Sequence, residues 1–222
     1  MLRRIPLVAP HRPAYSRAEF VSDAVVHLVG LALVLMAVPV LIVVTALLRG
    51  DAPSMLGVSI YGAAMLAMIA CSALYNMTPG TARAWLYQRL DHSAIYIKIA
   101  GTYTPFTLIS GHGLALTAGV WGAAALGVAL KLASPERFRW MALALYLGMG
   151  WAGVFAGQAL INALPAPVMW LMVTGGLLYT GGVAFYLWER LPFHNTIWHV
   201  FVLAATLVFY AAVVTLVLTT SA

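Results

Sequence analysis

Charged residues are scarce in this chain, and their scarcity indicates which solvent the fold needs. Lys, Arg, Asp and Glu make up 8% of the 222 residues, against about 25% in soluble domains. Hydrophobic residues make up 63%. So few polar groups cannot cover the apolar surface of a water-soluble fold. The composition therefore argues against an ordinary soluble domain and predicts a protein whose solvent is lipid.

Cysteine is almost absent as well. The one cysteine, Cys71, lies inside an apolar run, so an internal disulfide is excluded. The formal net charge of +6 is explained by basic residues beside membrane spans, where they contact lipid headgroups. We therefore expect membrane lipids as partners and no nucleic acid. The sequence indicates neither a protein partner nor an oligomeric state.

Long apolar runs fill most of the chain, and runs of roughly 17–25 residues can cross a membrane as helices. Pro, Gly and Asp separate the runs, as in Asp51-Ala-Pro53, Ser134-Pro135 and Pro165-Ala-Pro167. We predict an all-α integral membrane protein, a seven-transmembrane-helix bundle. It forms a single domain over residues 21–219, behind a cytoplasmic N-terminal segment of residues 1–20. The predicted spans are Val21–Leu48, Met55–Tyr75, His92–Ile109, Leu114–Leu132, Trp140–Leu160, Val168–Trp188 and Thr196–Thr219.

Basic residues lie almost entirely on one side of these spans. Four arginines precede the first span, whereas the opposite side carries only Arg49. Because flanks rich in Lys and Arg stay in the cytoplasm, we expect a cytoplasmic N-terminus and an external C-terminus.

Ionisable and polar residues gather at the cytoplasmic ends of four predicted spans. A titratable group at membrane depth is costly and marks a functional site by default. These residues are Asp23 and His27 in the first span, Ser72 and Asn76 in the second, Asp91 and His92 in the third, and His194 and His199 at the seventh.

The third span carries a further polar line. Asp91, Lys98 and Thr102 are seven and four residues apart, so they share one face of a helix. Lys98 would lie about 10 Å deeper than Asp91. A lysine there must face the bundle interior, a water pocket or a counter-ion. For one histidine near a helix end a structural role is the simpler interpretation, but Asp91, Lys98 and His199 together favour chemistry.

Several segments carry a family resemblance over nearly the whole chain. Leu90-Asp-His-Ser-Ala-Ile95, Ile99-Ala-Gly-Thr-Tyr-Thr-Pro-Phe106 and Trp198-His-Val-Phe-Val202 resemble the hemolysin III family. That family is the bacterial branch of the progestin and adipoQ receptors and is related to alkaline ceramidases. The resemblance implies a seven-helix bundle in the bacterial inner membrane, with an intramembrane zinc near the cytoplasmic face. It also implies a hydrolase-like site for amide-linked lipids.

The family pattern places one zinc-binding histidine at the end of the second span and two, four residues apart, on the seventh. An aspartate that opens the third span binds a metal-held water. Ser72, Asp91 and His199 match this pattern, and His27 matches another family histidine. Asn76 and Asn195, however, stand where two of the zinc-binding histidines are expected.

His194 lies five residues before His199, about 140° round a helix from it, so the two do not share a face. Three arrangements remain open. Zinc is held by a rearranged set of His199, His194, His27 and Asp91. Alternatively, no metal binds and Asp91 and His199 form a hydrogen-bonded polar core. In the third, the site has moved to Lys98, paired with Asp91 or Asp23.

Three functions follow as hypotheses. We expect a role in membrane or lipid homeostasis, through a polar site near the cytoplasmic face. The first alternative is a zinc-dependent, ceramidase-like lipid-amide hydrolase, with Asp91, Ser72 and Lys98 as candidate catalytic residues. The second is a pore-forming cytolysin, although no polar stripe repeats across several predicted helices, as a water-filled path requires.

Overall fold

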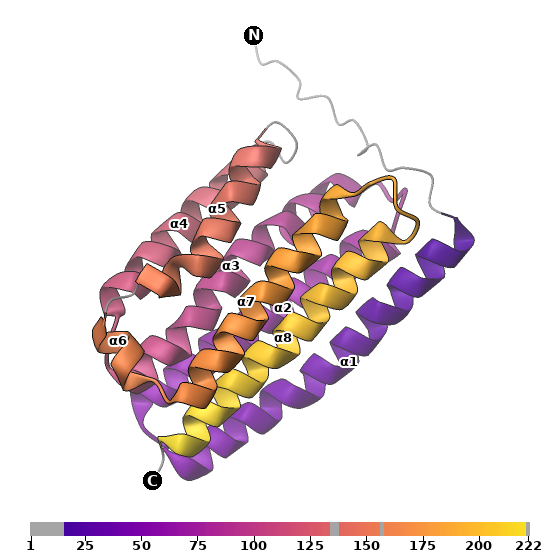
Figure 1. Cartoon of the computed structure of the whole chain (residues 1–222). Coiled ribbons are helices and arrows are strands. Elements are labelled where there is room, and N and C mark those ends of the chain that lie inside the picture. The colour runs from indigo at the N-terminus through magenta and orange to yellow at the C-terminus, as the bar shows by residue number, and fades with distance from the viewer. Residues whose placement is uncertain (1–15, 134–137, 156–157, 221–222) are drawn as a thin grey trace.

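The computed structural model describes residues 16–133, 138–155 and 158–220, and these form helices without a strand (Figure 1). The segment before Ser16 and the predicted break at Ser134-Pro135 lie outside the described residues. The elements are α1 (Arg17–Leu48), α2 (Ala52–Met77), α3 (Ala84–Ser110), α4 (Leu114–Ala133), α5 (Arg139–Trp151), the 3-10 turn η1 (Ala152–Phe155), α6 (Gln158–Ala163), α7 (Ala166–Leu187) and α8 (His194–Thr219).

Five of these helices, α1, α2, α4, α7 and α8, are long and apolar enough to cross a membrane. The chain is thus a multi-pass membrane protein, as its composition predicts. Helix α3 has 27 residues, but Arg89, Asp91 and Lys98 interrupt its apolar character. Its buried face carries many polar residues, which fits a helix in the bundle interior.

The fifth predicted span differs from the expectation of one continuous helix over Trp140–Leu160. Helix α5 ends at Trp151, η1 follows, and α6 begins at Gln158. Gly150 and Gly153 weaken the helix at this point. The Tyr103 hydroxyl of α3 donates to the Gly150 carbonyl at 2.8 Å and accepts from the Gly153 N–H at 2.9 Å. A tertiary contact thus satisfies backbone groups at the break.

Local capping sets where the first two helices begin. The Ser16 side chain accepts from the Glu19 N–H, and the Glu19 carboxylate accepts from the Ser16 N–H, which completes a capping box. Asp51 caps α2 by accepting from the Ser54 N–H at 2.9 Å. These short-range signals explain why helix starts near Val21 and Met55 could be predicted within a few residues.

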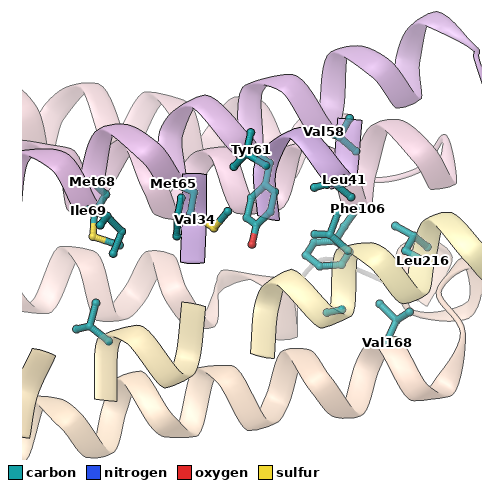
Figure 2. Close-up of a cluster of buried hydrophobic side chains, with 14 of the residues drawn as sticks. Val34, Leu41, Val58, Tyr61, Met65, Met68, Ile69, Phe106, Val168 and Leu216 are labelled. Atoms are coloured by element: carbon teal, nitrogen blue, oxygen red, sulfur yellow. The ribbon is translucent and has the colours of Figure 1, made fainter. Parts of the chain in front are cut away.

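Helices α2 and α3 pack closely, and α4 covers α3 (Figure 1). Helix α1 packs against α2 and α8, and α8 packs mainly against α7. A Cβ added at Gly101 of α3 would lie 2.7 Å from the Ala64 Cβ of α2, so these two backbones approach closely, as small residues permit in membrane bundles. The core of the bundle is apolar and includes Val34 of α1, Val58 and Met65 of α2, and Phe106 of α3 (Figure 2).

The same packing brings the start of α1, the end of α2 and the start of α8 together at one end of the bundle, where Ser22 and Thr196 lie 3.1 Å apart. At the opposite end, Arg49 contacts the Ser54 hydroxyl and the Thr220 carbonyl at 2.7 and 2.8 Å. The two ends of the bundle therefore differ in their chemistry.

Candidate metal site

Three ionisable side chains from the two ends of the sequence meet inside the bundle. Asp23, His27 and His199 each offer one ligand atom, and these atoms all lie within 4.8 Å of one another. The His199 Nδ1–H donates to the Asp23 carboxylate at 2.6 Å, and the His27 Nδ1 lies 3.8 Å from its second oxygen. The two imidazole rings stand edge to face, with centroids 4.4 Å apart.

The orientation of His27 follows from its hydrogen bonds. Its Nδ1 lies 2.8 Å from the Asp23 backbone carbonyl, which can only accept, so Nδ1 carries the proton. Nε2 therefore presents its lone pair to the interior. The Ser72 hydroxyl and the Asn76 amide nitrogen reach that atom at 3.2 and 3.5 Å.

Helical spacing explains why these side chains face each other. Asp23 and His27 are four residues apart on α1, as are Ser72 and Asn76 on α2, so each pair occupies one helix face. Asn76 also donates to the Ser72 carbonyl at 2.9 Å. The α2 pair thus contacts His27 of α1, and His199 of α8 contacts Asp23 of α1.

Burial gives the cluster its electrostatic character. Asp23 and His27 are buried, at 7% and 5% exposure, and the His199 side chain is 11% exposed. An unpaired carboxylate at this depth would be strongly unfavourable. The imidazole N–H of His199 offsets that cost, and a bound cation would do so as well.

The donor set fits a zinc ion. Two imidazole nitrogens and one carboxylate oxygen form a typical catalytic zinc set, which leaves a fourth position open. The His27 N–H on a backbone carbonyl is the usual second-shell contact of a zinc-binding histidine. A metal ion held by the Asp23 carboxylate and the His199 Nδ1 would take the place of the proton that these two groups share at 2.6 Å.

A polar cavity of ≈ 350 Å³ adjoins the cluster, between α2, α3, α4, α5, α7 and α8. Its wall includes Ser72, Asn76, Asp91, Asn195 and His199. The structure therefore places Asp91 beside the group that contains His199. The hydrogen-bond partner that the structure shows for His199 is Asp23, whereas one of the three open arrangements paired His199 with Asp91.

The remaining predicted site residues lie elsewhere. His194 is the first residue of α8 and is not part of the group, and its buried Nδ1 has no hydrogen-bond partner in the described chain. Lys98 donates to the Tyr179 hydroxyl at 2.6 Å and lines a second cavity, whose wall contains none of the three clustered residues. The pairing of Lys98 with Asp91 or Asp23 was one of three arrangements left open by the sequence, and the structure shows Tyr179 as the partner of Lys98 instead.

Asp23 was not among the metal ligands expected from sequence. Its spacing of four from His27 was visible, but the family pattern directed attention to the second and seventh spans. Only the packing of α1 against α8 shows that this acid meets His199.

Comparison with known proteins supports the family. The model of the haemolysin-III related family matches residues 17–210. "Hemolysin-3 homolog" of Bacillus subtilis (strain 168) is 35% identical over 193 residues, 85% of this chain and 89% of the relative. "Hemolysin-3" of Bacillus cereus is 34% identical over 206 residues, 91% and 94% of the two chains.

The human "Monocyte to macrophage differentiation factor" is 27% identical over 168 residues, 69% of this chain and 67% of the relative. It extends the similarity beyond bacteria. Since the family model spans most of the chain and both Bacillus relatives exceed 30% identity, this multi-pass membrane protein belongs to the haemolysin-III related family.

Proposed function

We propose that this protein serves membrane or lipid homeostasis through a divalent-metal site held by Asp23, His27 and His199. The observation that carries the proposal is the convergence of three buried ligand atoms within 4.8 Å, next to a polar cavity. Zinc is the ion that this mixed nitrogen and oxygen set suits best. The ligands differ from the family pattern because α1 supplies two of them.

We further propose a full seven-crossing topology. Helix α3 and the broken segment α5–η1–α6 would add two crossings to the five apolar helices, in a bacterial inner membrane. An odd number of crossings agrees with α1 beginning and α8 ending at opposite ends of the bundle (Figure 1). The cluster would then lie near the cytoplasmic face, where the loops carry most of the basic residues.

A second candidate function is the hydrolysis of a lipid amide, and Asp91 favours it. This carboxylate lines the same cavity as Ser72 and His199, so an acid, a hydroxyl and the proposed metal site face one volume. Bound zinc would supply an activated water there, since it lowers the pKa of that water to near neutrality. Asp91 would act as the base that accepts a proton. The Ser72 hydroxyl, 3.2 Å from the His27 Nε2, would keep the His27 ring in place.

Elemental analysis of the detergent-purified protein tests the metal site. We expect near-stoichiometric zinc in the wild type and much less than one zinc per protein in Asp23→Asn or His199→Ala, because each variant removes a ligand and even the loss of a ligand's hydrogen-bond partner lowers metal affinity about 10–100-fold. Glu189→Gln is the matched control, because this acid pairs with Arg139 at 2.7 Å and is not one of the three proposed ligands. Zinc-free wild type would show that the cluster is a hydrogen-bonded polar core instead.

Hydrolysis is tested separately, with zinc-loaded protein and ceramide or another acyl-amide lipid in mixed micelles. Release of fatty acid that Asp91→Asn abolishes, with zinc retained, would support the enzyme. If the protein binds zinc but releases no fatty acid, the hydrolase hypothesis is rejected and the homeostatic role through a non-catalytic metal site is favoured. The pore alternative stays a prediction, and dye release from liposomes by wild type would favour it.

A further inference from the structure

A second cavity holds a lysine that the proposed metal site does not use. Lys98 of α3 is only 3% exposed, yet it lines a largely apolar cavity of ≈ 260 Å³ between α3, the α5–η1–α6 segment, α7 and α8. Among the described residues that line this cavity, Lys98 is the one charged side chain. A cation in such a place needs a partner.

The surroundings of Lys98 satisfy its ammonium only in part. Its Nζ donates to the Tyr179 hydroxyl at 2.6 Å, and that hydroxyl lies 2.8 Å from Thr206 Oγ1, which donates to the Val202 carbonyl. The series of hydrogen bonds from Lys98 through Tyr179 and Thr206 therefore ends on a backbone carbonyl and not on a carboxylate. An ammonium has three N–H donors, and the described residues offer no second acceptor and no carboxylate to Nζ.

Aromatic rings complete this environment. The Lys98 Nζ lies 4.5 Å from the Tyr179 ring centroid and 5.2 Å from that of Phe209. Such rings attract a cation but do not neutralise its charge. The remaining N–H groups thus favour an anion beside Lys98.

The cavity also reaches the outer surface of the bundle. Val154 of η1 and Val173 of α7 line it and are 59% and 37% exposed. The surface here is at membrane depth, because α7 is an apolar span. A ligand could therefore enter from the lipid phase, beside the point where the fifth segment is broken.

We propose that this cavity binds a single-chain amphiphile with a carboxylate head, such as a free fatty acid, whose carboxylate pairs with Lys98. The apolar wall accepts the alkyl chain, and the Lys98 ammonium provides the one counter-charge. A carboxylate carries one negative charge, which one lysine neutralises, whereas a phosphate monoester brings up to two. None of the three proposed metal ligands lines this cavity, although it shares part of its wall, including Trp198 and Val202, with the polar cavity beside the metal cluster.

Binding of tritiated palmitate to the full-length protein in phosphatidylcholine nanodiscs tests the proposal. We expect saturable binding to wild type and binding about ten-fold weaker for Lys98→Met, which keeps the length of the side chain but loses the charge. The matched control is Lys131→Met, because Lys131 of α4 is also a buried lysine but faces the other cavity. Circular dichroism confirms that each variant is folded.

Competing ligands identify the head group. Unlabelled palmitate should displace the tracer better than hexadecyl phosphate, and hexadecanol, which lacks a charge, should not distinguish wild type from Lys98→Met. Equal palmitate binding by wild type and Lys98→Met, or stronger displacement by the phosphate, would overturn the assignment. Retained palmitate binding in Asp23→Asn is expected, so the lipid site and the metal site can fail separately.

Discussion

Asp51 shows how one side chain links charge to helix stability. Asp51 lies outside the spans. The hydrogen bond that its carboxylate accepts from the Ser54 backbone N–H lowers its pKa, and the Ser54 hydroxyl and Arg49 lower it further. A carboxyl group whose pKa is lower in the folded state stabilises the fold above its unfolded pKa. That contribution is lost as the pH falls through the lowered folded value.

We therefore predict that Asp51→Ala lowers the thermal stability of the detergent-solubilised protein at pH 7, by about 0.5–2 kcal/mol for the lost cap. Asp51→Asn keeps a capping oxygen and should lose less. The difference between wild type and Asp51→Asn should start to shrink below about pH 4, where the carboxyl takes up a proton in the unfolded state, and should disappear as the pH falls through the lowered pKa of the folded state. A difference that stays constant from pH 7 to pH 3 would contradict a charge effect.

At the scale of elements, the broken fifth segment depends on a residue of another helix. Tyr103 of α3 supplies both a donor and an acceptor to the backbone around Gly150 and Gly153. A membrane offers no water to replace these partners. The break also borders the cavity of Lys98, so its stability bears on that cavity's access to lipid.

Tyr103→Phe removes only the hydroxyl. We predict a loss of about 1–3 kcal/mol of stability, since the Gly150 carbonyl and the Gly153 N–H lose a buried partner. Tyr146→Phe is the control, because Tyr146 also lines the cavity but makes no hydrogen bond in the described chain. Thermal unfolding in matched detergent would show the difference, and equal effects of both variants would contradict the role of Tyr103.

At the scale of the whole molecule, the proposed seven-crossing topology would place each loop on a definite side of the membrane. In a Cys71→Ser background, we predict that an impermeant maleimide labels His112→Cys and Asn162→Cys in intact spheroplasts. Ala82→Cys should react only after the membrane is opened. Protection of Asn162→Cys in intact spheroplasts would mean that the α5–η1–α6 segment does not cross.

Sequence alone was sufficient to predict the all-helical membrane class, most helix boundaries and the family. Hydropathy and the Pro, Gly and Asp residues between runs are local properties, and caps such as that of Asp51 need only four consecutive residues. The same reasoning placed His27, Ser72 and His199 near one end of the bundle, because each lies near the end of a predicted span.

The site itself was decided by tertiary structure. Asp23 and His199 are separated by 176 residues, and Lys98 and Tyr179 by 81. Which side chains meet depends on how each helix is rotated and how its neighbours pack, and hydropathy is nearly uniform around these helices, so it does not specify rotation. The break after Trp151 has the same origin, because Tyr103 stabilises it from another helix. The spans thus follow from sequence, whereas the pairing of their polar residues follows from packing.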